Sequence, residues 1–119
     1  MSTPKRIQLR RTKGWRMPEN TVKVARPTKW GNPYRVGDTN DMTGLIILDT
    51  AEAADLYQAH IEMAAAVRPE LYSEWVLAVR RELAGKNLAC FCPLTDAQGN
   101  HVPCHADVLL ELANGGAER

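Results

Sequence analysis

The chain has 119 residues, of which 45% are apolar and 24% are charged, and these values are typical of one globular domain. They argue against disorder for most of the chain, and no apolar run approaches the ~20 residues of a membrane span, so a membrane protein is excluded. The charged N-terminus lacks the apolar region of a secretory signal, so the three cysteines predict free thiols in a reducing cytosol. We therefore expect a single cytoplasmic domain over residues 1–119, with frayed tails at 1–4 and 115–119.

Basic residues are concentrated in the first third of the chain. Residues 1–35 contain ten lysines and arginines and a single acid, a net charge of +9. Residues 36–119 contain five basic and thirteen acidic residues, a net charge of −8, so the overall charge of +1 hides an asymmetry. Trp15, Trp30 and Tyr34 lie among the basic residues, and this mixture suits phosphate contact and base stacking. Alternatively, the basic segment folds against the acidic remainder, which neutralises it.

The predicted elements begin with two strands. Apolar and polar residues alternate over 7–10 and, with more β-branched side chains, over 21–25. The segment that follows contains two prolines, Pro27 and Pro33, which prevent regular secondary structure there. The region that leads to the next element is therefore expected to be a loop.

Three helices and one further strand complete the predicted fold. Apolar residues at helical spacing predict helices over about 50–67, 69–83 and 105–113, with Pro69 well placed at the start of the second. The mostly apolar run 87–92 predicts a buried strand. The order of elements indicates an α/β or α+β fold: a small single domain with a short mixed sheet flanked by about three helices.

Cys90, Cys92, Cys104 and His105 are the most informative residues of the sequence. Alternate positions of a strand share a face, so we expect Cys90 and Cys92 to point the same way. Cys104 and His105 open the last predicted helix. Both pairs would then lie where ligands collect in open α/β sheets, at the carboxyl end of a strand beside a helix N-terminus. The same N-terminus favours a thiolate, so we expect a lowered pKa for Cys104.

These four residues have three interpretations. In the first they bind zinc, since Cys90, Cys92, Cys104 and His105 are suitable ligands, although their spacing differs from that of common zinc knuckles. In the second, Cys92 or Cys104 is an activated thiol with His105 or His101 as its base. In the third, Cys90 packs as a small apolar side chain and the region of Cys104 only caps a helix. The sequence leaves all three open.

Three segments in a fixed order carry a family resemblance: 26–34 (RPTKWGNPY), 85–92 (GKNLACFC) and 104–109 (CHADVL). Together they resemble the uncharacterised family catalogued as domain of unknown function 4326, whose members are small proteins of bacteria, especially actinobacteria, and of their phages. The resemblance covers a core of about residues 5–114 and implies a shared fold, but it brings no established activity. It also suggests that residues 30–33 and the Cys/His residues form one site.

From this site we expect binding of a nucleotide-like or phosphate-bearing ligand. Trp30 would stack on a ring of the ligand, and Asn32 would form a hydrogen bond with it. Arg26 and Lys29 would contact phosphate, and Arg35 would add positive charge.

The domain would act on the ligand through catalytic residues drawn from Cys92, Cys104 and His105. Two alternatives remain. One is a nucleic-acid-binding protein that uses the basic and aromatic N-terminal segment, with the cysteines structural or bound to zinc. The other is a phage-encoded protein that binds and modulates a host protein. No cofactor other than zinc, and no membrane partner, is expected.

Overall fold

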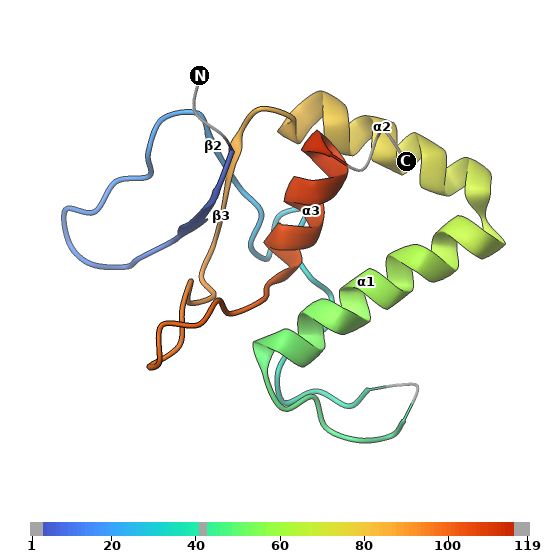
Figure 1. The fold of residues 1–119 in the computed structure, drawn as a ribbon, viewed down its shortest axis with the longest axis horizontal. Helices are drawn as coiled ribbons and strands as arrows, with labels where there is room; N and C mark the ends of the chain where they lie inside the picture. The colour runs from blue at the N-terminus through green and yellow to red at the C-terminus, as the bar shows by residue number, and fades with distance from the viewer. Residues whose placement is uncertain (1–3, 41–42, 116–119) are drawn as a thin grey trace.

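The computed structural model describes residues 4–40 and 43–115. Along the chain its elements are β1 (Arg6–Gln8), β2 (Thr21–Lys23), α1 (Thr50–Val67), α2 (Pro69–Leu83), β3 (Asn87–Cys90) and α3 (His105–Asn114), as shown in Figure 1. The three predicted helices and three predicted strands are therefore confirmed. The tails expected to fray lie outside the described residues, apart from residues 4 and 115.

β3 is the central strand of a three-stranded sheet with the order β1-β3-β2. Both neighbours run parallel to it, with Ile7 opposite Ala89 on one side and Val22 opposite Leu88 on the other. β3 is bonded on both edges and covered by helix, so its last three side chains, Leu88, Ala89 and Cys90, are buried. The fold is thus α/β as expected, but the sheet is purely parallel and not mixed.

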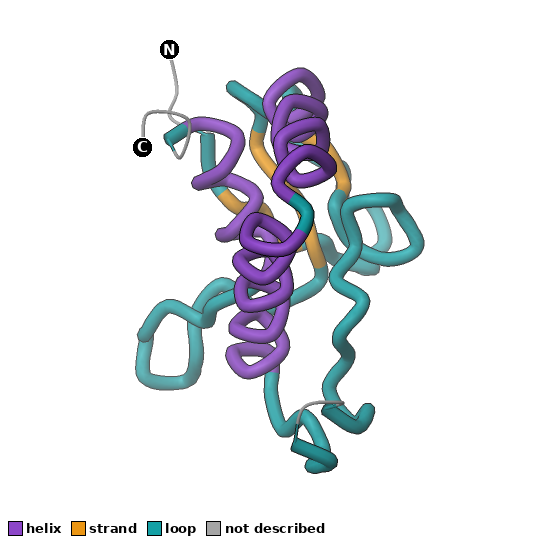
Figure 2. The backbone as a smooth tube through the Cα atoms, turned by 90° about the vertical axis from the view of Figure 1, so that its right-hand side faces the viewer, coloured by secondary structure: helices purple, strands orange, loops and turns teal. Residues whose placement is uncertain are grey.

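The helices lie on one side of the sheet, with α3 between the strands and the other two helices. α3 contacts β1, β3, α1 and α2, and in Figure 1 the strands lie to its left while α1 and α2 lie to its right. The side view of Figure 2 shows the three helices in front of the strands. Leu109 of α3, Val79 and Leu83 of α2, and Leu88 of β3 are fully buried in the resulting core.

Local sequence signals explain where the helices begin. The carboxylate of Asp49 accepts a hydrogen bond of 2.8 Å from the backbone N–H of Glu52, so it caps the N-terminus of α1. Pro69 begins α2 directly after Arg68, which caps the C-terminus of α1. Proline suits the first turn of a helix because it has no backbone N–H that would need an acceptor there. Within the described ranges, none of the helices combines the length and the apolar character that a membrane crossing requires.

Each strand ends two residues before the predicted carboxyl end, at positions 8, 23 and 90 instead of 10, 25 and 92. The last cross-strand bonds run from Leu9 N to Cys90 O, at 2.7 Å, and from Val24 N to Ala89 O, at 2.8 Å. Beyond these bonds the three chain segments separate. They separate at the same edge of the sheet, since parallel strands all point one way.

We predict that Leu88→Ala destabilises the fold by about 2–5 kcal/mol, because it opens a cavity in the centre of the sheet. Urea unfolding followed by circular dichroism measures this change. Leu77→Ala is the matched control, since Leu77 lies on α2 with 60% of its side chain exposed. Equal stability of the two variants would contradict the assignment of β3 as the buried centre.

Candidate functional site

A pocket of about 400 Å³ lies at the carboxyl edge of the sheet. Three of its lining residues follow the three strands: Arg11 comes after β1, Arg26 after β2 and Cys92 after β3. Thr50, the first residue of α1, and His105, the first residue of α3, also line it. The carboxyl ends of parallel strands are where open α/β sheets bind ligands, and helix N-termini favour anions.

Three cysteines form the floor of this pocket, and we call Cys90, Cys92 and Cys104 the cysteine cluster. Their sulfur atoms all lie within 4.8 Å of one another, and the Sγ atoms of Cys90 and Cys104 are 3.1 Å apart. Cys90 and Cys104 are buried, whereas Cys92 is half-buried. Cys90 and Cys92 therefore converge as expected, although Cys92 lies beyond the end of β3. The three sulfurs could hold a metal ion.

His105 reaches the cysteine cluster through Cys104. Its Nε2 lies 2.9 Å from the carbonyl oxygen of Val24, which can only accept, so Nε2 carries the hydrogen. Burial lowers the pKa of His105, and the ring is therefore neutral at pH 7. Its Nδ1, 3.4 Å from the Cys104 sulfur, then presents a lone pair toward the cluster. A neutral imidazole whose other nitrogen donates to a backbone carbonyl is the usual arrangement of a metal-binding histidine.

Hydrogen bonds within the cysteine cluster lower the pKa of one thiol and raise the pKa of another. The thiols of Cys104 and Cys90 donate to the Cys92 sulfur and lower the pKa of Cys92 to about 3. The hydrogen bond of Cys104 with Cys90, then its bond with Cys92 and its burial, raise the pKa of Cys104 above its ordinary value. The helix N-terminus does favour a thiolate at Cys104, through the backbone N–H of Ala106, but this effect is smaller. The expected low pKa thus belongs to Cys92 and not to Cys104.

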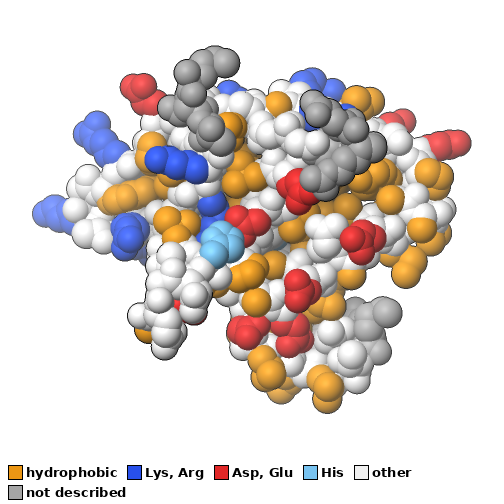
Figure 3. All heavy atoms as spheres, viewed as in Figure 1, with side chains coloured by type: hydrophobic (Ala, Val, Ile, Leu, Met, Phe, Trp, Pro, Cys, Tyr) orange, Lys and Arg blue, Asp and Glu red, His pale blue; other side chains and the backbone are white. Residues whose placement is uncertain are grey.

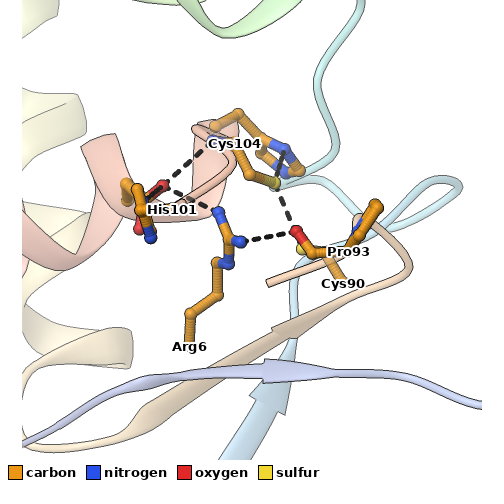
Figure 4. A network of polar contacts seen from close by, with 7 residues as sticks. Arg6, Cys90, Pro93, His101 and Cys104 are labelled. Atoms are coloured by element: carbon orange, nitrogen blue, oxygen red, sulfur yellow. Dashed lines mark hydrogen bonds and ion pairs between the residues drawn. The ribbon is translucent and has the colours of Figure 1, made fainter. Parts of the chain in front are cut away.

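A partly buried ion pair links α3 to the sheet beside the cluster. Nη1 of Arg6 donates to Oδ2 of Asp107 at 2.8 Å, and Nη2 donates to the carbonyl oxygen of Pro93, also at 2.8 Å. Figure 4 shows the guanidinium of Arg6 reaching between Pro93 and the start of α3. The same Oδ2 accepts from the backbone N–H of Cys104 at 2.9 Å and lies 3.0 Å from Nε2 of His101. Asp107 therefore not only complements the dipole of α3 but also pairs with Arg6 of β1.

The segment 26–34 is held in place by close backbone packing. A Cβ on Gly31 would lie 2.8 Å from Cγ of Arg26, so only glycine fits there. The buried Asn32 side chain donates to Ala53 O of α1 at 3.1 Å and accepts from Tyr34 N at 2.8 Å. Asn32 lines the pocket, but its amide is engaged within the protein. Asn32 therefore positions the loop, and its bond to a ligand stays a prediction.

Trp30 and Lys29 do not line the pocket, in contrast to the expectation for both. Trp30 is only 6% exposed and packs in the core against Trp75, with ring centroids 6.4 Å apart. A large apolar side chain gains more from burial than from exposure at a pocket mouth. Lys29 forms an ion pair with Glu82 at 2.7 Å. The aromatic rings that do line the pocket are those of Tyr34 and Phe91.

The pocket brings together most of the other expected site residues, although they are distant in the sequence. Arg26, Arg35, the cysteine cluster and His105 share it. Of residues 30–33, which were expected to join the Cys/His residues in one site, only Asn32 lines this pocket. Arg11 also lines it and was not expected to. Arg11 comes just after β1, as Arg26 comes just after β2. These positions predict that both residues lie at the pocket only if β1 and β2 are known to run parallel to β3.

The basic N-terminal segment is only partly neutralised by the rest of the chain. Arg6 pairs with Asp107 and Lys29 with Glu82, whereas most of its other cations are exposed. On the face seen in Figure 3, Lys and Arg side chains gather over the strands and the N-terminal loops at the left. Acidic side chains gather over the helices. The charge asymmetry of the sequence is thus also an asymmetry in space.

Asp107→Asn is predicted to destabilise the protein by about 2–3 kcal/mol, because it leaves the buried Arg6 guanidinium without a counter-ion. The cost is below that of a fully buried pair, since the Asp107 side chain is 32% exposed and partly screened by water. Chemical denaturation measures it against Asp55→Asn, a change of an exposed acid on α1. If both variants unfold at the same denaturant concentration as the parent protein, the ion pair has no structural role.

The sequence of this chain matches one family of proteins. The family model described as Domain of unknown function (DUF4326) matches residues 7–115, nearly the whole chain. No curated protein and no solved structure matches the chain. The match covers the sheet, the pocket and the cysteine cluster together. The chain therefore belongs to the family of domain of unknown function 4326.

Proposed function

We propose that this protein binds a phosphate-bearing, nucleotide-like ligand in the pocket, above a zinc ion held by the cysteine cluster. One observation carries the proposal. Three arginines, Arg11, Arg26 and Arg35, line the pocket together with the first residues of two helices, Thr50 and His105, and none of the described lining residues is acidic. Such a concentration of positive charge suits a ligand with several negative charges.

The arginines are arranged to bind an anion. Nη1 of Arg26 donates to Asn32 O at 2.5 Å and to Tyr34 O at 3.5 Å, which fixes the guanidinium within its own loop. Arg35 forms no ion pair with any described residue. Guanidinium groups bind phosphate oxygens through two parallel hydrogen bonds, so an arginine without an acidic partner is a ready phosphate ligand.

Aromatic side chains at the same pocket supply a place for a base. The ring of Phe91 is 36% exposed, and the guanidinium carbon of Arg11 lies 4.1 Å from its centroid. Tyr34 lines the pocket beside Arg35. Flat rings next to guanidinium groups favour stacking of a nucleobase whose phosphates meet the cations. These rings take the role that the sequence suggested for Trp30.

The donor atoms of the cysteine cluster fit zinc. Thiolates are preferred zinc ligands, and tetrahedral bonds of about 2.3 Å separate two sulfurs by roughly 3.8 Å, so a group of three sulfurs within 4.8 Å has a suitable size. His105 Nδ1 is the fourth candidate ligand. With only the three thiolates bound, zinc would keep an open position and would supply a Lewis acid at the floor of the pocket; with His105 as the fourth ligand, its coordination would be closed and its role structural. Cys92, the half-buried member of the cluster, is the thiol nearest to solvent and hence to a ligand.

Binding of single-stranded nucleic acid is the second candidate function. The observation that favours it is the cationic surround of Phe91, where Arg11 and Lys23 lie 4.1 and 5.7 Å from the ring centroid. An exposed ring flanked by cations can stack on a base and contact the adjoining phosphates. Modulation of a host protein stays a prediction, because none of the observations above bears on it.

Natively purified protein is predicted to contain about one zinc ion per chain, as expected for a single site with three thiolate ligands. Elemental analysis measures the content. Cys92→Ser and Cys104→Ser should lose most of the zinc because each removes a thiolate. His60→Ala is the control, since His60 is an exposed histidine of α1 outside the pocket. Zinc retained in both serine variants, or no zinc in the parent, would contradict a metal role for the cluster.

Arg11→Gln and Arg35→Gln are each predicted to weaken the binding of inorganic pyrophosphate about tenfold or more, because each removes a charge-assisted hydrogen bond of about 1.5–3 kcal/mol. Isothermal titration calorimetry measures the affinity. Arg68→Gln removes an exposed cation that does not line the pocket, so its affinity should stay at the parent value. Equal weakening by all three changes would mean that only the overall charge attracts the anion.

A further inference from the structure

Residues 36–40 and 43–48, which we call the arm, form a protruding hairpin with an exposed apolar surface. Ile47 N donates to Asp38 O at 2.8 Å and Asn40 N donates to Leu45 O at 2.7 Å, so the two sides of the arm pair with each other. The arm projects away from the helices and the sheet at the bottom of both ribbon views (Figures 1 and 2). Ile47 is buried and anchors it.

The other aliphatic side chains of the arm are open to solvent. Val36, Leu45, Ile46 and Leu48 are 50%, 68%, 58% and 76% exposed. Several aliphatic side chains exposed on one hairpin mark an interaction site, and a two-stranded hairpin has little stability of its own in water. The arm is therefore expected to be covered by a partner.

A groove elsewhere on the molecule has matching properties. It has a volume of about 440 Å³ and lies between α1 and α2, with Tyr57, Leu71 and Trp75 among its apolar lining residues. The charged residues among its described lining are the cations Arg68 and Lys29, and Lys29 already pairs with Glu82. The groove can thus accept apolar side chains that are flanked by acids.

The charges around the arm favour the groove, and not the arm of another copy, as the surface to which the arm binds. Asp38 lies in the arm, and Asp49, Glu52 and Asp55 follow it on the chain. Figure 3 shows acidic side chains beside the apolar surface at the bottom of the view. Two arms packed together would bring these acids into mutual repulsion. An arm seated in the groove would bring them toward Arg68 and Lys29.

We propose that the arm of one copy of this protein docks in the groove of a second copy. The apolar side chains of the arm fill the groove, and its acids face the cations at the rim. Because the arm and the groove are different surfaces, the contact is head-to-tail, and repetition of it produces a ring or an open row of subunits. This inference does not depend on the ligand or the metal of the pocket.

Sedimentation velocity over a series of concentrations tests the proposal with the full chain. The arm variant is Leu45→Ser with Leu48→Ser, and both changes affect exposed side chains, so the fold should persist. The groove variant is Leu71→Asp, which puts a carboxylate into the groove at the first turn of α2, where helices accept acids. The control is Leu77→Asp, an equally exposed leucine of α2 outside the groove.

We expect the parent and the control to associate as concentration rises, and the arm and groove variants each to stay monomeric. An equimolar mixture of the two variants should form a two-chain complex that grows no further, because one intact arm then meets one intact groove. A monomeric parent overturns the proposal, as does a groove variant that still associates. A mixture that stays monomeric also overturns it, since it excludes the head-to-tail contact.

Discussion

The carboxylate of Asp107 joins the three parts of the chain that build the site. One of its oxygens accepts from the guanidinium of Arg6 in β1 and from the backbone N–H of Cys104, and lies within hydrogen-bond distance of His101 in the loop before α3. Arg6 in turn bonds to Pro93, just after β3. This partly buried charge pair therefore helps to fix the position of α3 over the sheet, together with the core packing of Ala106 and Leu109, and so brings Cys104 to the other cysteines.

This constraint explains why binding groups gather at one edge of a small sheet. Parallel strands send their following residues to the same edge, and the ion pair brings the N-terminus of α3 to that edge as well. The segment 26–34, fixed by Gly31 and Asn32, closes the pocket on another side. Cations, two helix N-termini and three thiols thus share one pocket, although the residues that provide them span most of the chain.

Local signals in the sequence predict the elements and much of the site. Pro69 and the cap at Asp49 define the helices, and the short spacing of Cys90 and Cys92 indicates their convergence. Contacts between residues far apart in the sequence cannot be predicted from these local signals. The sequence does not reveal that Arg6 is buried against an acid 101 positions away, and a tryptophan among cations can serve either a ligand or the core. Trp30 serves the core, because its neighbours in space are helix residues that its sequence neighbours do not identify.

The central claim is that an anion binds at the carboxyl edge of the sheet, between the first turns of α1 and α3. An amide NMR titration with inorganic pyrophosphate tests this claim most directly, because it locates the bound anion. We expect saturable shifts at the amides of Thr50, Ala51 and Ala106, where the two helices that line the pocket begin. Shifts confined to the exposed cations of residues 10–16, or no saturation at all, would contradict it.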